Sequence, residues 1–294
     1  MLRRHLLVGA SAGLVAACAG AMPEPRDENG APLTADEAGR PIVPVMINGR
    51  GPFACVVDTA AQRTGLGQAL IDELALTPLQ GGAVLHGSTG AHSIPLYQLA
   101  SISVAGVTHE GVIAVPLLHR RQTSARAVIG MDAFAGRRLT FDFAARRLQV
   151  AASGAAADRH WRETAVELLH GTFAIAALAI GAVNASGVID TGAARTAANR
   201  VLLQALGLGG ADVAPGEAMT GVAGVEAPTR IGRMESFALA GEQFGPLDIA
   251  FGALPVFEAL GLGDRPALVL GVDFLRTLRG LSVDFGAHTL GIRR

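Results

Sequence analysis

The sequence has little of several features that mark common protein classes. Only two of its 294 residues are cysteines, and only 4% are aromatic. Lys and Arg together number 24 against 25 Asp and Glu, and no basic run is interleaved with aromatic residues, so nucleic acid is not an expected partner. Half of the residues are hydrophobic, so a chain of this length can bury a core that folds without metal or disulfides.

Scarce aromatics and abundant glycine favour one kind of fold. The chain has 38 glycines, and glycine is permissive in tight turns. Many short strands joined by such turns suit this composition better than a long helical bundle. Apolar runs long enough for an ordinary membrane span are also lacking, because Leu6–Ala17 and Phe173–Val183 are both too short. We predict the second run to be a buried strand.

Residues 1–18 are predicted to be an export signal. Arg3 and Arg4 form a positive start, and Leu6–Ala17 is apolar and rich in small residues. The Val-Ala-Ala-Cys segment that ends at Cys18 resembles a bacterial lipobox, which implies a lipid on Cys18 and a membrane anchor. An ordinary signal peptide that contains a cysteine is the alternative. The paired arginines also loosely match a twin-arginine signal.

Residues 19–40 are predicted to be a flexible tether between membrane and domain. They are rich in Pro, Gly, Asp and Glu and show no hydrophobic period. If Cys18 carries a lipid, Cys55 has no partner for a disulfide. Cys55 lies in an apolar run without the His of a cysteine protease, so we expect a small buried thiol.

No cluster of residues predicts a metal or a cofactor. No phosphate-binding glycine loop occurs with its Lys, and Ser88 and Ser186 lack the Gly-x-Ser-x-Gly context of serine hydrolases. The histidines also lack the spacing of zinc ligands. This holds for His86, His92, His109 and His119.

From Pro41 onward one pattern occurs twice. Each copy has an apolar run, a glycine turn, a second apolar run and an Asp-Thr turn, which predicts a hairpin that ends in a polar tip. The two polar tips are Asp58-Thr59-Ala60 and Asp190-Thr191-Gly192.

Both copies then continue in the same order, with a segment of helical spacing, a glycine-rich stretch and an apolar-apolar-Gly element. Short strands with one short helix per copy predict a mostly-β protein of two similar lobes with a cleft between them, residues 41–152 and 160–294. The paired segments are 68–76 and 199–208, Gly87-Ser88-Thr89-Gly90 and Gly221-Val222-Ala223-Gly224, and Val128-Ile129-Gly130 and Val269-Leu270-Gly271.

The two Asp turns carry the predicted chemistry. An ionised Asp directly after β-forming residues is costly to bury, so each turn must present its carboxylate to a cleft or surround it with donors. Two equivalent turns can present Asp58 and Asp190 to each other, and repulsion then leaves one ionised and one protonated. The titration belongs to the pair. Such a pair hydrolyses an amide by general acid–base catalysis without metal or a covalent intermediate.

The duplicated motif resembles that of aspartic peptidases of the retropepsin and pepsin type, specifically the bacterial single-chain members with two retropepsin-like (acid protease) β-barrel lobes. The resemblance covers the chain from Pro41 on. It implies that Asp58 and Asp190 bind the nucleophilic water between them. It also implies that Thr59 and Thr191 hydrogen-bond across the lobe junction.

The resemblance assigns roles to the glycines as well. Gly130 and Gly271 would let a strand pass close behind each Asp, and the glycine-rich stretches near Gly87 and Gly221 would be flaps that close over an extended peptide. The implied partner is therefore a peptide or protein substrate. A monomer suffices because both Asp residues are in one chain, and the export signal predicts a periplasmic, lipid-anchored location.

Two departures from the family pattern bear on activity. Ala60 replaces the usual Gly of the first turn and adds a methyl group near the catalytic floor. Tyr97, the single tyrosine, lies past the first glycine-rich stretch, which does not match a pepsin-style flap tyrosine.

These residues predict an aspartic endopeptidase that cleaves extended segments of envelope or secreted proteins. The alternative is a non-catalytic peptide-binding envelope lipoprotein with a degenerate protease fold, and a third possibility is a purely structural envelope protein. Two further duplicated pairs, Asp132 with Asp273 and Asp142 with Asp284, are predicted to be structural.

Overall fold

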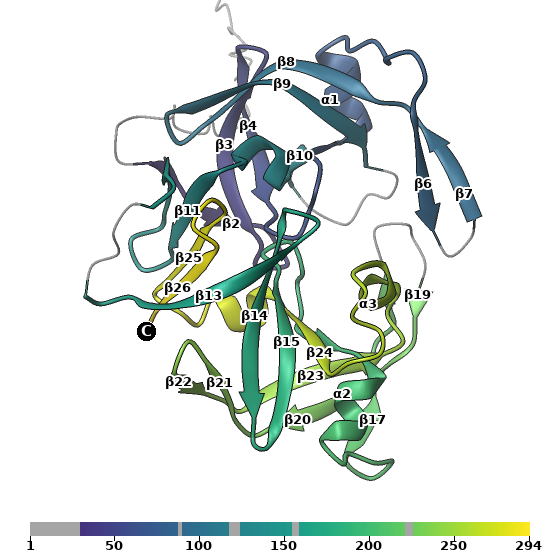
Figure 1. Cartoon of the computed structure of the whole chain (residues 1–294). Coiled ribbons are helices and arrows are strands. Elements are labelled where there is room, and N and C mark those ends of the chain that lie inside the picture. The colour runs from purple at the N-terminus through teal and green to yellow at the C-terminus, as the bar shows by residue number, and fades with distance from the viewer. Residues whose placement is uncertain (1–29, 88–89, 118–123, 155–158, 221–225) are drawn as a thin grey trace, which may run out of the picture.

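The computed structural model describes residues 30–87, 90–117, 124–154, 159–220 and 226–294 (Figure 1). Within these ranges no helix is long and apolar enough to cross a membrane. Residues 1–29, which include the predicted export signal and Cys18, lie outside the described part.

The first lobe is a closed barrel of six strands. Strand order is β3-β4-β10-β5-β9-β8, and pairing of β8 with β3 closes the barrel. Alternating and fully buried side chains of these strands form the core, as expected for strands that enclose a hydrophobic interior. The elements are β2 (Thr34–Ala35), β3 (Pro41–Ile47), β4 (Arg50–Val57), β5 (Gly65–Leu66), α1 (Gln68–Glu73), β6 (Ala83–Gly87), β7 (Gly90–Ile94), β8 (Tyr97–Val104), β9 (Val107–Pro116), β10 (Ala127–Ile129) and the 3₁₀ helix η1 (Met131–Phe134).

The second lobe repeats this arrangement. Its strands β14, β15, β24, β16 and β23 correspond to β3, β4, β10, β5 and β9, and β21 pairs with β14 as β8 pairs with β3. The elements are β14 (Phe173–Ile180), β15 (Val183–Ile189), β16 (Ala197–Ala198), α2 (Arg200–Ala205), β17 (Val213–Pro215), β18 (Met219–Thr220), β19 (Glu226–Ala227), β20 (Thr229–Met234), β21 (Phe237–Leu239), β22 (Glu242–Phe244), β23 (Leu247–Gly252), α3 (Pro255–Ala259), β24 (Ala267–Leu270) and α4 (Val272–Leu275).

The prediction of a mostly-β protein with two similar lobes is confirmed. Both segments of helical spacing contain a short helix, α1 and α2, and the apolar run that begins at Phe173 is the strand β14. Each lobe also has a short helix directly after its apolar-apolar-Gly element, η1 and α4, and Asp132 and Asp273 lie in the first turns of these helices.

A third set of strands joins the lobes. In order β1-β12-β11-β25-β26-β13, it brings β11 of the first half against β25 of the second, with Leu139 opposite Val283. The two halves therefore share backbone hydrogen bonds and do not merely touch. The strands are β1 (Ala31–Pro32), β11 (Arg137–Asp142), β12 (Arg147–Ala152), β13 (Arg162–Leu169), β25 (Gly280–Asp284) and β26 (Thr289–Arg293).

The predicted tether is wrong for residues 30–40. β1 pairs with β12, so that Ala31 lies opposite Leu148 and is fully buried. The Asp36 carboxylate is buried together with the Arg40 guanidinium, whose Nε donates to Asp36 Oδ2 at 2.7 Å. Polar residues without a hydrophobic period can thus be ordered by an edge strand and a paired buried charge. Residues 19–29 lie outside the described ranges.

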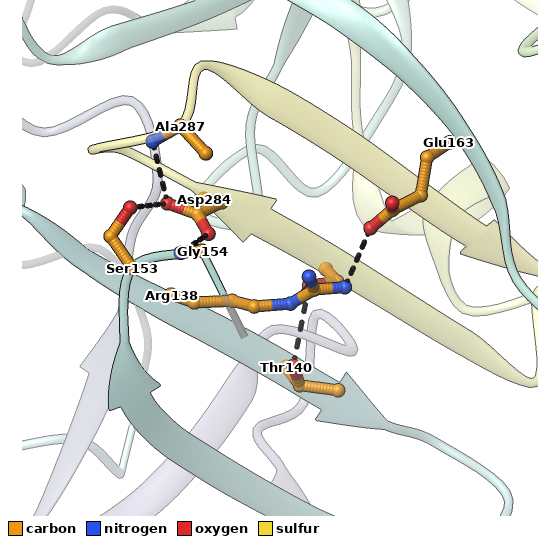
Figure 2. A network of polar contacts seen from close by, with 8 residues as sticks. Arg138, Thr140, Ser153, Gly154, Glu163, Asp284 and Ala287 are labelled. Carbon is orange, nitrogen blue, oxygen red and sulfur yellow. Dashed lines mark hydrogen bonds and ion pairs between the residues drawn. The ribbon is translucent and has the colours of Figure 1, made fainter. Parts of the chain in front are cut away.

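Arg138, on the first-half strand β11, makes hydrogen bonds that hold the shared sheet together (Figure 2). It is almost fully buried on β11 and reaches two strands of the second half. Its Nε donates to Ser282 Oγ at 2.8 Å, and its terminal nitrogen donates to Glu163 at 2.8 Å. Thr140 lies within hydrogen-bond distance of the same Ser282 hydroxyl, at 3.3 Å.

Asp284 fastens the same sheet from the second lobe (Figure 2). Its buried carboxylate accepts hydrogen bonds from the Ser153 hydroxyl at 2.6 Å and from the amides of Gly154 and Ala287, both at 2.8 Å. Burial by itself raises the pKa of Asp284, but these hydrogen bonds and one from Gly286 outweigh it and hold the pKa below its ordinary value.

We predict that Asp284→Asn destabilises the protein by about 1–3 kcal/mol near pH 7, because a charged, buried hydrogen-bond acceptor is lost. A lowered folded-state pKa gives stability that is present above the unfolded pKa and is lost as the pH falls through the folded value. The gap in unfolding free energy between parent and variant should therefore narrow below about pH 4.

Urea denaturation of both proteins at a series of pH values measures this gap. Asp264→Asn, at an exposed position, is the control and should change stability little at any pH. If the parent and Asp284→Asn had equal unfolding free energies near neutral pH, or if their difference grew on acidification, the Asp284 carboxylate would not stabilise the sheet in this way.

Candidate active site

The two predicted Asp residues occupy equivalent places in the two lobes. Asp58 follows β4 and donates its amide to Ile129 of β10 at 3.0 Å, and Asp190 follows β15 and donates to Leu270 of β24 at 3.1 Å. In both lobes these strand pairs are parallel. Each carboxylate therefore emerges, half-buried, at the end of a buried strand pair.

Reciprocal hydrogen bonds between Thr59 and Thr191 hold the two turns together. The Thr59 hydroxyl donates to the Ile189 carbonyl at 2.7 Å and accepts from the Thr191 amide at 3.1 Å. The Thr191 hydroxyl donates to the Val57 carbonyl at 2.7 Å and accepts from the Thr59 amide at 3.1 Å. Both threonines are fully buried. The four bonds obey a two-fold symmetry and join residues 130 to 134 positions apart.

Gly192 shows that the two carboxylates meet at one place. A methyl group on Gly192 would overlap the carboxylate of Asp58, so the Asp58 side chain crosses from its own lobe to the turn of the other. The Gly192 and Ala193 amides also donate to Asp190 Oδ1, both at 2.8 Å. Asp58 and Asp190 thus contact the same turn from opposite lobes.

Ala60 breaks the symmetry of the pair. It stands in the first turn where Gly192 stands in the second, and its amide donates to Asp58 Oδ1 at 2.9 Å, as Gly192 does to Asp190. Its methyl group packs against a hydrophobic cluster of the second lobe. A carboxylate can therefore approach Ala60 less closely than it approaches Gly192.

Gly130 and Gly271 are packed tightly in both lobes. Their backbones are extended and nearly identical, with φ of −87° and −88°. A methyl group on Gly130 would lie 2.7 Å from the Arg63 carbonyl oxygen, and one on Gly271 would lie 2.7 Å from that of Arg195. The chain that each glycine accommodates is thus the loop that follows the Asp turn.

A family model described as aspartyl protease matches the chain over residues 43–133 and 176–274. The chain belongs to the aspartyl protease family. The two matched segments fall on the two lobes, as expected for retropepsin-like lobes in tandem. No curated protein matches the chain.

Two hydrogen-bonded Thr–Asp pairs support the loops of this aspartyl protease site, and the sequence analysis did not predict them. Thr64 donates its amide and hydroxyl to Asp132, at 3.0 and 2.9 Å, and its hydroxyl accepts from the Gly130 amide at 3.2 Å. Thr196 makes the same contacts with Asp273 and Gly271. Each Thr lies six residues after a predicted catalytic Asp, and this repeated spacing could have identified it.

These contacts fit a structural role for Asp132 and Asp273, because they fix the loop after each turn. Burial raises the pKa of Asp132 above its ordinary value, although hydrogen bonds from Thr64 oppose the rise.

The predicted flaps are described only in part. Gly87 and Gly90 face each other at the tip of the β6–β7 hairpin, and Ser88 and Thr89 lie outside the described residues. The second stretch, Gly221-Val222-Ala223-Gly224, lies wholly outside them, between the paired strands β18 and β19. The two hairpins approach each other from opposite lobes, on the side of the molecule that carries α3 (Figure 1).

A cavity of about 240 Å³ lies beside the first turn. The first lobe contributes Gln62, Arg63 and Asp132 to its wall, and the second contributes Thr172 and Phe285. The Thr172 hydroxyl is buried and has no hydrogen-bond partner in the described part of the chain.

Other chemistries find little support in the described ranges. No group of three or more His, Cys, Asp or Glu side chains there is placed to hold a metal. Cys55 is buried, and burial raises the pKa of its thiol to about 12, against smaller lowering effects of Ala127 and Arg126. The thiol is therefore protonated at neutral pH and is a poor nucleophile.

We predict that Thr59→Val destabilises the protein by about 2–4 kcal/mol, because the Ile189 carbonyl and the Thr191 amide both lose a partner while buried. Thr59→Ser keeps the hydroxyl and should stay within about 1 kcal/mol of the parent. Urea denaturation measures both. Equal stability of the Val and Ser variants would show that these hydrogen bonds contribute nothing.

We predict that Gly192→Ala lowers peptide-cleavage rates about a hundredfold, because the new methyl group displaces the Asp58 carboxylate and small displacements of reacting groups are that costly. Gly210→Ala is the control, since a methyl group at Gly210 meets open space. Initial rates on one peptide, with circular dichroism to verify folding, make the comparison. An unimpaired Gly192→Ala variant would show that Asp58 does not act from this position.

Proposed function

We propose that this aspartyl protease family member is an endopeptidase that hydrolyses peptide bonds of extended protein segments, using a water activated between Asp58 and Asp190. One observation carries the proposal, namely that the Asp58 carboxylate lies against the Gly192 turn to which Asp190 is hydrogen-bonded. Two carboxylates from two lobes then act on one water.

The proposed mechanism follows from the chemistry of such a pair. One carboxylate, ionised, takes a proton from the water as it attacks the peptide carbonyl carbon. The other, protonated, donates to the carbonyl oxygen, which gives a tetrahedral gem-diol. As the C–N bond breaks, the proton taken from the water passes to the departing amine nitrogen, and the other carboxylate takes back a proton from a gem-diol hydroxyl. The backbone amides of Ala60, Gly192 and Ala193 orient the carboxylates. No covalent intermediate is formed.

Features around the turns support an extended peptide as substrate. The hairpins β6–β7 and β18–β19 offer backbone on one side of the molecule, where a strand-like peptide can pair. The cavity beside Gln62 and Arg63 has room for one substrate side chain.

The proposed setting is the cell envelope. The export signal in residues 1–18 and the lipobox-like sequence at Cys18 support a periplasmic protein anchored by a lipid. Residues 30–40 pack onto the lobes, so the tether that this setting needs is confined to residues 19–29. Since both Asp turns are in one chain, a monomer suffices.

Ala60 favours a second candidate, a peptide-binding protein that has lost turnover. Its methyl group stands where the other turn has a glycine, and this asymmetry could hold the carboxylates out of catalytic geometry. Ala60→Gly separates the two candidates. A large gain in cleavage indicates a crippled enzyme, and an unchanged rate indicates an enzyme adapted to Ala.

Digestion of a mixed peptide library by the purified protein, at pH values from about 3 to 8, tests the proposal. We expect the parent and the exposed control Asp264→Asn to cleave peptides and Asp58→Asn to leave them intact. Peptides that bind to the parent without being cut at any pH would instead establish the peptide-binding alternative.

A further inference from the structure

A second and larger cavity lies at one end of the sheet that joins the lobes. Its volume is about 580 Å³, which is within the range of small-molecule sites. Its charged lining comes from the end of β11, the residues that precede β13 and β25, and the end of β26, where Asp142, His160, Arg279, Arg293 and Arg294 lie. The C-terminal end of the chain lies away from β6, β7 and α3 (Figure 1), so this cavity is separate from the peptide site.

The lining is strongly cationic. Three arginines and one histidine line it together with a single acidic residue, in a chain whose net charge is −1. That carboxylate, Asp142, is already engaged, since it accepts from the Ala145 amide at 2.8 Å and from Arg293 at 2.7 Å. Burial raises the pKa of Asp142, but these two contacts outweigh it and keep the pKa below its ordinary value. One carboxylate therefore offsets one of three arginines.

Arg279 and Arg294 have guanidinium N–H groups that can still donate to a ligand. The Arg279 side chain makes no hydrogen bond or ion pair with the described part of the chain. Arg294 lies over the Phe244 ring, 4.9 Å from its centroid, and its contact with Glu242 is long, at 3.9 Å. Ion pairs of this exposed kind hold a side chain only weakly, so both guanidinium groups are available to a ligand.

Arg293 gives the cavity a fixed wall. Its guanidinium lies over the Trp161 ring, 5.3 Å from the centroid, and is paired with Asp142. Its backbone carbonyl accepts from the Arg279 amide at 2.8 Å, which ties the two arginines to adjacent positions. Its Nε is buried and has no hydrogen-bond partner among the described residues. The Arg293 guanidinium is thus positioned before any ligand arrives.

We propose that this cavity binds a phosphate group, carried either by a small soluble molecule or by a lipid headgroup. A phosphate dianion can pair with both Arg279 and Arg294, the two lining arginines that Asp142 does not engage, whereas a single carboxylate carries only one charge. The planar fork of each guanidinium matches two phosphate oxygens. Arg279 and Arg294 bind the phosphate, and Arg293 positions the site.

Calorimetric titration of the full chain with inorganic phosphate and with phenyl phosphate, at constant ionic strength, tests the site. We expect saturable binding that weakens at least about tenfold, equivalent to about 1.4 kcal/mol, in the double variant Arg279→Ala/Arg294→Ala. Arg200→Ala/Arg265→Ala, which removes two exposed arginines elsewhere, should bind as the parent does. Peptide cleavage should be unchanged in both double variants.

Vesicle sedimentation distinguishes the two sources of phosphate. One set contains phosphatidylcholine with about 30% phosphatidic acid, whose phosphate monoester can carry two negative charges, and the other contains phosphatidylcholine alone. Binding to the anionic vesicles that is lost in Arg279→Ala/Arg294→Ala identifies a lipid headgroup, whereas binding of the soluble phosphates alone identifies a free ligand. Absence of binding to any probe, or equal binding by the parent and this variant, would overturn the proposal.

Discussion

The structure depends on the reciprocal hydrogen bonds between Thr59 and Thr191. Each threonine is fully buried, and each satisfies a carbonyl and an amide of the opposite lobe. Neither lobe can satisfy these groups alone, because in each of the four bonds the donor and the acceptor belong to different lobes. Unpaired buried polar groups are expensive, so correct docking of the lobes and correct placement of Asp58 and Asp190 are one event.

The shared sheet supports this docking at a distance from the site. Strands β11 and β25 pair directly, and Arg138 and Asp284 add side-chain bonds across the junction. The lobes are therefore fixed at two places, the threonine pair and the sheet. A phosphate ligand at the far end of that sheet would bind next to the second fixed point, where segments of both halves meet.

Repetition in the sequence predicted much of this. The order of apolar runs, Asp turns and glycine elements sufficed for the two lobes, the helices α1 and α2, and the paired position of Asp58 and Asp190. It did not predict that the Asp58 side chain contacts Gly192 of the other lobe, because a local sequence pattern does not specify contacts between lobes. Residues 30–40 were misjudged because a buried Asp36–Arg40 pair resembles solvated charge. The contacts of Thr64 and Thr196 were missed although their spacing repeats.

In the proposed mechanism, the two lobes build one catalytic site. Residues that act as one unit have non-additive effects, because loss of either disables the whole. Cleavage rates of Asp58→Asn, Asp190→Asn and the double variant on one peptide test this directly. We predict that each single variant loses nearly all activity and that the double variant is no worse than either. A single variant that retains substantial activity, or losses that multiply in the double variant, would contradict a shared site.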